Sequence, residues 1–289
     1  MKVKHYMIWT KKQVAAVLGI LLSAAALLTL LAVALPNAFA VATATTERKI
    51  PIYCTDRGEK VVSLTFDAAW GDEDTPQLID IFQKYGIHVT FFVVGEWADR
   101  CPDSVKALKE AGHEVMNHSN THPHMPQLSR DGMVQEIQAA NEKIAALTGE
   151  TPVLFRAPYG DYNNALIETL DSLGMYCIQW DVDSLDWKDP PVEDIVSRVT
   201  SRVQSGSIVL FHNAAKNTPE ALPAIIEKLQ ADGYTFLKAS EMIYREDYTI
   251  NHEGRQIANT PATTASTAPS AAPDTTAAPA PDPAAVPEN

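Results

Sequence analysis

Cysteine is scarce in this chain. Only Cys54, Cys101 and Cys177 occur among its 289 residues. Three thiols cannot all pair, and none shows the Cys-x-x-Cys spacing of a thiolate zinc site. The sequence therefore argues against a disulfide-stapled scaffold and against a cysteine-based metal site. One disulfide between Cys54 and Cys101 is an open expectation, and unpaired thiols are at least as well supported.

Basic side chains are also few. The chain has 23 lysines and arginines against 36 aspartates and glutamates, which gives a formal net charge of −13. Four of the lysines lie within the first twelve residues, so the remainder is still more acidic. Binding to nucleic acid requires a basic surface that neutralises phosphates, and the composition argues against such a partner. A neutral polymer or a small molecule is the better expectation.

Residues 47–248 contain no break rich in glycine, serine or proline, which predicts one folded domain. Residues 1–46 and 249–289 flank it and differ from it in composition. The last 31 residues, 259–289, have no aromatic residue, leucine or isoleucine and are rich in proline, alanine and threonine. Such a segment cannot bury enough apolar surface to offset its ordering entropy, so we expect a disordered tail over residues 249–289. A wall-spanning or glycosylated stalk is the functional alternative.

The N-terminal segment has the pattern of a signal peptide or a membrane anchor. Val14–Leu35 is 22 residues long, carries no charge and follows a lysine-bearing stretch. As a helix it would span roughly 33 Å, about the hydrocarbon thickness of a bilayer. Ala38-Phe39-Ala40 offers the small residues that signal peptidase prefers, so cleavage and retention both remain open. Either outcome predicts an extracytoplasmic domain, with the membrane as a partner if the segment is retained. A buried helix of a soluble protein is the less favoured alternative.

Apolar strand-like runs alternate with amphipathic helical stretches through the domain. The expected strands are Val61–Phe66, Val89–Val94, Glu114–Asn117, Val153–Arg156, Met175–Trp180, Ser207–Phe211 and Tyr234–Leu237. The expected helices are Thr75–Tyr85, Ser104–Ala111, Arg130–Thr148, Ala165–Leu173, Val192–Val203 and Pro219–Ala231. This alternation predicts an α/β fold with a mostly parallel sheet and helices outside it. With about seven such units, closure into a barrel is a reasonable expectation.

Polar residues of catalytic type follow five of these strands. They are Asp67, His118 with His122, Arg156 with Tyr159, Asp183 with Asp186 and Trp187, and His212. The carboxyl ends of parallel strands share one rim of a barrel, where active sites lie. Packing alone does not readily explain so many strand ends of this kind, and the sequence therefore predicts a catalytic site at this rim.

Each of these residues has a simpler interpretation when it is taken alone. His118 and His122 have the four-residue spacing at which two imidazoles can meet one metal, but two histidines in a polar loop are commoner. Asp67 at a strand end could cap a helix, although Asp72 or Asp74 is better placed for that role. The histidine after the last apolar strand could be an ordinary core residue.

Taken together, the residues resemble the polysaccharide deacetylases of the NodB-homology type, carbohydrate esterase family 4, from about Val61 to Tyr244. Five ordered motifs carry the resemblance: Thr65-Phe66-Asp67, His118-Ser119-Asn120-Thr121-His122, Arg156-Ala157-Pro158-Tyr159-Gly160, Asp183-Ser184-Leu185-Asp186-Trp187 and Leu210-Phe211-His212. The run Phe66-Asp67-Ala68-Ala69-Trp70-Gly71 is most similar to the sporulation-associated branch. The resemblance implies a distorted (β/α) barrel of about seven strands. It also implies a hydrolase that removes N-acetyl groups from a cell-envelope polysaccharide and releases acetate, and export together with the sporulation-like run favours peptidoglycan.

The resemblance also implies a divalent metal, with zinc as the first candidate, held by His118 and His122. The family's first motif has two adjacent aspartates, the first a base and the second a metal ligand, and here Ala68 occupies the second position. A methyl group cannot bind a metal, so the site lacks one anionic ligand and should bind the ion less tightly. Asp72 or Asp67 could lean in as a substitute.

The remaining roles follow from the same resemblance. Asp67 would take a proton from water and Arg156 would hold Asp67 in place. The backbone N–H of Tyr159 would face the oxyanion, and His212, supported by Asp186, would protonate the departing nitrogen. The acetyl methyl group would enter an apolar slot formed by Leu210 and Trp187.

Three other functions remain open. The first is a glycan-binding protein on the deacetylase scaffold, inactive because of Ala68. A glycosidase using Asp67 with Asp183 or Asp186 is the second, and a structural envelope protein is the third. Acetate release from an N-acetylated glycan separates the deacetylase from the first and third, and new reducing ends without acetate would indicate the glycosidase.

Overall fold

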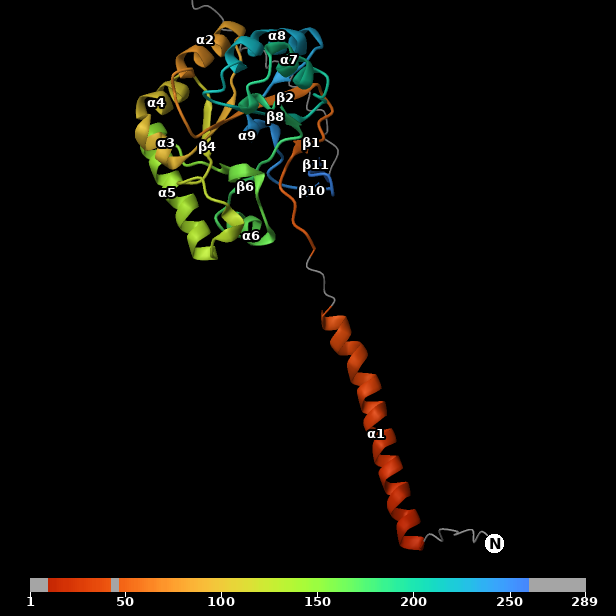
Figure 1. Cartoon of the computed structure of the whole chain (residues 1–289). Coiled ribbons are helices and arrows are strands. Elements are labelled where there is room, and N and C mark those ends of the chain that lie inside the picture. The colour runs from red at the N-terminus through yellow and green to blue at the C-terminus, as the bar shows by residue number, and fades with distance from the viewer. Residues whose placement is uncertain (1–9, 43–46, 260–289) are drawn as a thin grey trace, which may run out of the picture. The chain divides into compact units, whose positions relative to one another are not determined.

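The computed structural model describes residues 10–42 and 47–259, which belong to two compact units (Figure 1). The N-terminal unit is the helix α1, Lys11–Ala42. Its stretch Lys11–Leu31 is long and apolar enough to cross a membrane, and a signal sequence near an N-terminus has the same character. The helix therefore agrees with both interpretations of this segment. The greater part of the expected tail, residues 260–289, lies outside the described residues.

Eleven strands in the second unit form one sheet within the described residues. They are β1 (Cys54–Thr55), β2 (Val61–Ala68), β3 (Thr90–Val93), β4 (Glu114–Asn117), β5 (Leu154–Phe155), β6 (Tyr176–Cys177), β7 (Val182–Asp183), β8 (Ser207–His212), β9 (Thr235–Phe236), β10 (Tyr248–Ile250) and β11 (Arg255–Ala258). Their order is β10-β11-β1-β8-β2-β3-β4-β5-β6, with β7 beside β8 and β9 beside β2. All the expected strands occur, and the pairs among them are parallel as predicted.

The sheet curls back on itself. Ile52 forms a parallel bridge to Ile178, just beyond the end of β6. The N–H of Ile52 donates to the carbonyl oxygen of Cys177 at 2.9 Å, and the N–H of Gln179 donates to that of Ile52 at 2.7 Å. β1 follows directly and pairs antiparallel with β8. The segment around Ile52 thus joins both ends of the run β8-β2-β3-β4-β5-β6, which confirms the distorted barrel.

Helices cover the outside of this sheet. They are α2 (Thr75–Tyr85), α3 (Gly95–Arg100), α4 (Pro102–Glu110), α5 (Arg130–Thr148), α6 (Asn164–Ser172), α7 (Val192–Thr200), α8 (Thr218–Ala231) and the short α9 (Ala239–Met242). Figure 1 shows α2, α3, α4 and α5 along one outer side of the domain and α7 with α8 beside each other. The bounds of α5 agree with the prediction because its ends carry clear signals. The Ser129 hydroxyl accepts the N–H of Gly132 at 3.2 Å, and Gly149 ends the helix with a φ of 74°.

The core is built on β2. All eight of its residues are buried, as expected for a strand covered on both faces. The Phe66 ring lies 5.0 Å from that of Phe91 and 5.2 Å from that of Phe211, both stacked, and 5.5 Å from that of Phe82, edge to face. This aromatic cluster fixes β2 between its neighbours β3 and β8. The strand ends that carry the polar residues are held in place by it.

The ordered domain continues past Tyr248, where the sequence placed its end. β10 pairs antiparallel with β11, and β11 pairs in parallel with β1. The buried side chain of Gln256 accepts the N–H of Tyr244 at 2.7 Å and donates to its carbonyl oxygen at 2.6 Å. Both strands are short and partly polar, so they lack the apolar alternation by which longer strands are predicted. Residues 249–258 therefore belong to the fold and not to a tail.

All three cysteines are free thiols, with Cys54 and Cys177 buried. The disulfide between Cys54 and Cys101 is therefore absent from the structure, and the alternative expectation of unpaired thiols is confirmed. Burial raises the pKa of both the Cys54 and the Cys177 thiol to about 12. Neither thiol is ionised at neutral pH, so neither is a reactive nucleophile.

Candidate active site

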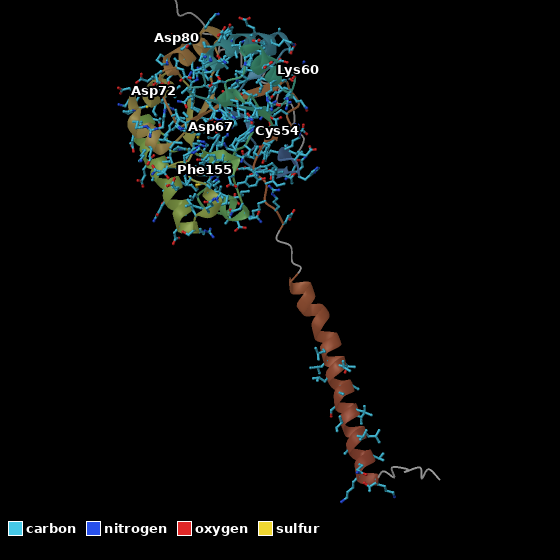
Figure 2. The ribbon with its side chains drawn as sticks, viewed as in Figure 1. Cys54, Lys60, Asp67, Asp72, Asp80 and Phe155 are labelled. Atoms are coloured by element: carbon cyan, nitrogen blue, oxygen red, sulfur yellow. The ribbon has the colours of Figure 1, made fainter. Side chains whose placement is uncertain are left out.

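Asp67 and Arg156 form a buried ion pair at the carboxyl end of β2. Asp67, which Figure 2 labels within the folded domain, is 6% exposed. Arg156 is completely buried. Arg156 Nη1 donates to Asp67 Oδ1 at 2.8 Å, while Nη2 donates to Thr65 Oγ1 at 2.8 Å and to the carbonyl oxygen of Gln179 at 3.1 Å. Burial alone would raise the pKa of Asp67, but the nearby His118, Arg156 and His212 outweigh it and lower that pKa. Asp67 is therefore a carboxylate at neutral pH, held in one orientation.

The loop after β4 brings His118 and His122 together. Their ring centroids are 5.0 Å apart, and both rings line the same pocket. His118 Nδ1 lies 2.9 Å from the carbonyl oxygen of Arg156, and its Nε2 lies 3.5 Å from Asp67 Oδ2. Burial lowers the pKa of His118 and lowers that of His122 to about 4. Both imidazoles are therefore neutral near pH 7, which is the form that binds a metal.

Hydrogen bonds to the side chains of Ser119 and Glu136 hold this loop in a strained shape. Ser119 and His122 have φ angles of 65° and 61°, in the left-handed region that non-glycine residues rarely adopt. The Ser119 hydroxyl accepts the N–H of His122 at 3.0 Å. Glu136 of α5 accepts the N–H groups of Asn120 at 2.9 Å and Thr121 at 2.8 Å, and the hydroxyl of Thr121 at 2.9 Å. The sequence did not single out Glu136, because its partners lie on a different element.

These residues fit a divalent ion incompletely. Because the carbonyl oxygen of Arg156 contacts His118 Nδ1, Nε2 is the nitrogen that would coordinate an ion, as is usual for a metal-binding histidine. Ala68, however, is buried and offers only a methyl group. Within residues 10–42 and 47–259, no three or more histidine, cysteine, aspartate or glutamate side chains are grouped to hold a metal. The donor set thus comprises two imidazoles and lacks the third ligand of the family pattern.

Asp72 does not replace the missing ligand. Its carboxylate accepts the hydroxyl of Ser104 at 2.7 Å, and Figure 2 shows it at the edge of the domain, away from Asp67. Asp74 occupies the N-cap position of α2, but its carboxylate accepts the N–H of Ala214 at 2.9 Å instead of capping the helix. The Ser104 hydroxyl and the backbone N–H of Ala214, both from distant parts of the sequence, provide these contacts, so neither carboxylate makes the cap expected from local spacing.

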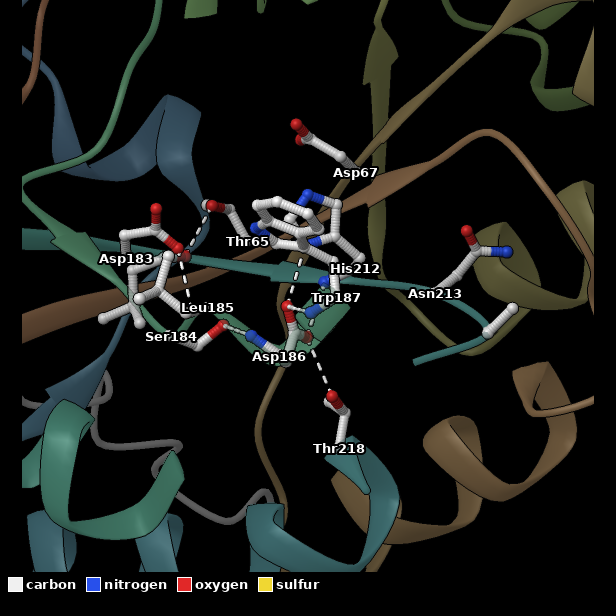
Figure 3. Close-up of polar contacts among 12 residues, drawn as sticks. Thr65, Asp67, Asp183, Ser184, Leu185, Asp186, Trp187, His212, Asn213 and Thr218 are labelled. Atoms are coloured by element: carbon white, nitrogen blue, oxygen red, sulfur yellow. Dashed lines mark hydrogen bonds and ion pairs between the residues drawn. The ribbon is translucent and has the colours of Figure 1, made fainter. Parts of the chain in front are cut away.

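His212 and Asp186 form the second charged pair (Figure 3). His212 Nδ1 lies 2.8 Å from Asp186 Oδ1, and Asp186 Oδ2 accepts the backbone N–H of His212 and the hydroxyl of Thr218, both at 2.8 Å. Burial alone would lower the pKa of His212, but the hydrogen bond and charge of Asp186 outweigh it and raise that pKa. His212 therefore holds its proton to a higher pH than a free histidine.

Both pairs face one pocket of about 410 Å³. Its lining includes seven of the nine predicted site residues, namely Asp67, His118, His122, Tyr159, Trp187, Leu210 and His212. The other two, Arg156 and Asp186, are buried and support Asp67 and His212. Leu210 is 3% exposed, whereas Trp187 is 57% exposed and Tyr159 61% exposed, so the two aromatic side chains stand at the rim. Tyr159 has a φ of 61°, and its role at an oxyanion remains a prediction.

Trp70, within the run Phe66–Gly71, is a further rim residue to which the sequence assigns no role. It is 61% exposed and lines the same pocket. The sequence could have indicated this residue, because a tryptophan just past the end of a strand lies at the rim. Its exposure is visible only in the structure.

Comparison with known proteins places this geometry in a family. The sequence profile described as "Polysaccharide deacetylase" matches residues 55–178. The peptidoglycan-N-acetylglucosamine deacetylase of Bacillus cereus is 34% identical over 190 residues, which cover 64% of this chain and 89% of that protein. The chain belongs to the polysaccharide deacetylase family. The uncharacterized protein YlxY of Bacillus subtilis is 30% identical over 193 residues, covering 67% of this chain and only 60% of YlxY.

The solved structures add a second kind of relative. Wild-type BA3943, described as a carbohydrate esterase family 4 pseudoenzyme from Bacillus anthracis, is 35% identical with a TM-score of 0.65, over 66% of this chain and 68% of that one. A BA3943 mutant described as having restored enzymatic activity is 36% identical with the same TM-score of 0.65, over 66% of this chain and 70% of that one. The deacetylase fold is therefore shared by relatives named as enzymes and by one named as a pseudoenzyme.

Proposed function

We propose that the chain hydrolyses N-acetyl groups on a cell-envelope polysaccharide, with peptidoglycan as the substrate class. The observation that carries the proposal is the pairing of Asp186 with His212 beside the carboxylate of Asp67, at the rim of one pocket. Two groups of opposite protonation state on one pocket are what a hydrolysis with separate base and acid requires. Relatives named as peptidoglycan deacetylases support the substrate class.

In this hydrolysis the residues of the site have separate roles. The acetyl methyl group enters the apolar slot of Leu210 and Trp187. Asp67 accepts a proton from the attacking water, while Arg156 keeps its carboxylate charged and oriented. His212 donates its proton to the nitrogen that leaves, and Asp186 keeps His212 protonated until then. The products are acetate and a free amino sugar.

A divalent ion such as zinc would be held by His118 and His122 and would supply a Lewis acid for the carbonyl and the water. None of the proton transfers above is assigned to it. With two donors the ion should bind weakly, because each missing ligand lowers affinity.

Glycan binding without turnover is the second candidate function. It is favoured by Ala68 at the ligand position and by similarity to the BA3943 pseudoenzyme. The glycosidase alternative has less support. Asp186, one of its proposed partners, is fully buried, and both of its oxygens accept hydrogen bonds within the fold. Such a carboxylate is not available to protonate a glycosidic oxygen.

We further propose that the domain acts outside the cytoplasm and that residues 1–46 are a signal peptide or a membrane anchor. The folded domain extends to residue 258. We also propose that the chain belongs to the sporulation-associated branch of the family. The length and apolar character of α1 support export. Support for the branch comes from the run Phe66–Gly71, in which Ala68 and Trp70 occur together.

The experiment combines three readouts on the full chain purified in detergent and incubated with peptidoglycan fragments. Metal content, acetate release and new reducing ends are measured in the same samples. The proposal predicts acetate without new reducing ends. Saturable binding without acetate, at any added zinc concentration, would overturn the hydrolase and leave the glycan-binding protein.

A further inference from the structure

A second hollow adjoins the active-site pocket beyond His122. It has a volume of about 320 Å³, and Trp70, His122 and Tyr159 line both hollows. Its other walls include Arg100 and Glu96 of α3. A volume of this order is enough for a small ligand. A glycan with its N-acetyl group in the first pocket could therefore place a neighbouring unit in the second.

Trp70 lines both hollows and lies just past the end of β2. The segment that carries it is held by side chains on both sides. Ala69 donates its N–H to Asn213 Oδ1 at 3.2 Å, and the carbonyl oxygen of Gly71 accepts from Trp97 Nε1 at 3.0 Å and from Asn213 Nδ2. Trp70 itself remains 61% exposed. A large exposed aromatic side chain beside a hollow, carried on a backbone segment that is held on both sides, is typical of a ligand-binding surface.

Arg100 is the cation of the second hollow. Its Nη2 donates to the carbonyl oxygen of Ala69 at 2.9 Å, and a guanidinium carries five N–H donors in all. Among the described residues Arg100 forms no salt bridge, whereas its neighbour Asp99 is paired with Lys143 at 2.6 Å. An exposed arginine with unused donors, in a chain of net charge −13, is suited to an anionic group.

We infer that the second hollow is a subsite for a carboxylate-bearing sugar unit adjacent to the N-acetyl group that is hydrolysed. Trp70 packs against the sugar ring and Arg100 binds the carboxylate. The inference rests on the proposed function and goes beyond it by assigning the side chains that recognise the acidic sugar unit of that substrate class. A strand in which N-acetylmuramic acid, with its lactyl carboxylate, alternates with N-acetylglucosamine has this chemistry.

Glu96 opposes this preference. It lies one helical turn before Arg100 on α3 and lines the same hollow. Its charge repels a carboxylate ligand, so Glu96→Gln should tighten binding of the acidic glycan and leave that of a neutral glycan unchanged. Replacing Arg100 and replacing Glu96 should therefore have opposite effects on the ratio of the affinities for the acidic and the neutral glycan.

The test is calorimetric binding of two tetrasaccharides to the full chain in detergent and chelator. One is the peptide-free alternating tetramer of N-acetylglucosamine and N-acetylmuramic acid, and the other is the neutral tetramer of N-acetylglucosamine. We expect the wild-type chain to bind the acidic tetramer about tenfold more tightly, as for one charge-assisted hydrogen bond. Arg100→Gln should abolish this preference and retain the affinity for the neutral tetramer. Trp70→Ala should weaken both.

Arg245→Gln is the matched control, because it removes the same charge from an exposed residue outside the hollow and should retain the preference. An unchanged preference in Arg100→Gln would overturn the subsite. So would an equal loss for both tetramers, because Arg100 would then only hold the segment that carries Trp70. If the wild-type chain binds neither tetramer, the proposed function itself fails, and the subsite with it.

Discussion

Asp186 holds His212 at two points. One oxygen of the carboxylate lies 2.8 Å from the ring nitrogen Nδ1, and the other accepts the backbone N–H of the same histidine at 2.8 Å. Thr218 at the start of α8 donates to that second oxygen. The ring is thereby oriented so that its other nitrogen, Nε2, is left to face the pocket that His212 lines. A proton donor whose pKa and direction are both set by one buried carboxylate is the central feature of the site.

Replacing Asp186 should shift the pH dependence of His212. The pKa of His212 is raised, so the protonated form is favoured in the folded state. The stability that this contributes is present below the ordinary pKa of 6.5 and is lost as pH rises through the raised value. Asp186→Asn removes the charge that raises the pKa of His212, so the titration of His212 should move to lower pH.

The measurement is an NMR titration of the His212 ring, accompanied by the pH profile of acetate release. The alkaline limb of that profile should move with the titration. Asp194→Asn on the exposed side of α7 is the control and should leave both curves in place. An unshifted titration in Asp186→Asn would show that Asp186 does not set the protonation of His212.

A carboxylate at position 68 should complete the metal site. Ala68→Asp adds an anionic donor to His118 and His122 and leaves a fourth position for water. We expect zinc to bind at least about tenfold more tightly than in the wild-type chain. The measurement is calorimetric titration of both forms after chelation.

Ala68→Asn is the matched control, since it has nearly the same size but no charge and should bind zinc less tightly than Ala68→Asp. Equal zinc affinity in all three forms would show that His118 and His122 do not act as a metal-binding pair.

His113 should make the fold sensitive to acid. It is 3% exposed, its Nδ1 accepts the N–H of Val89 at 3.3 Å, and burial lowers its pKa from 6.5 to about 4. A histidine with a lowered pKa contributes stability above pH 6.5 that is lost progressively as pH falls toward 4. The loss attributable to this residue is up to about 3 kcal/mol.

His113→Asn keeps a hydrogen-bond acceptor and cannot be protonated in this range. Its free energy of unfolding, measured with denaturant between pH 4 and 7, should therefore fall less steeply with pH than that of the wild type. His252→Asn, at a residue that is 88% exposed, should retain the wild-type slope. A His113→Asn slope equal to the wild-type slope would contradict the assignment.

Ending the chain at residue 248 should destabilise the domain. Gln256 forms two hydrogen bonds with the backbone of Tyr244, and Arg255 Nη1 donates to the carbonyl oxygen of Thr55 at 3.2 Å. Loss of these bonds with the pairing of β11 to β1 should lower the free energy of unfolding by about 2–4 kcal/mol.

Thermal unfolding of chains that end at residue 248 and at residue 259 measures this effect. Gln256→Ala in the longer chain should reproduce part of the loss, whereas Glu253→Ala, at a 69% exposed side chain, should not. Equal melting temperatures for the two chain lengths would show that the folded domain ends at residue 248.

The sequence predicted what its local patterns encode. α2 and α5 have the predicted bounds because proline, serine and glycine mark the helix ends clearly. The bounds of β4, with its buried Val115 and Met116, also agree with the prediction. The carboxyl ends of parallel strands meet at one rim, so the positions of Asp67 and His212 also followed from the pattern.

What the sequence could not predict depends on contacts between distant segments. Glu136 holds the loop before His122 from a helix on the outside of the sheet, and Thr218 reaches Asp186 from α8. The strand β11 pairs with β1, although the two strands lie near opposite ends of the domain's sequence. Asp74 carries the right residue type for a cap but bonds to Ala214, which only the folded structure brings near.

The most direct test of the account is acetate release from N-acetylated peptidoglycan fragments by the wild-type chain and by His212→Ala, with zinc supplied to both. The wild-type chain should release acetate, and removal of the proton donor should lower the rate by a factor on the order of 10²–10⁴. Circular dichroism should show that the variant keeps its fold, since the histidine side chain lies at the pocket rather than in the core. A folded His212→Ala chain that releases acetate at the wild-type rate would contradict the central claim.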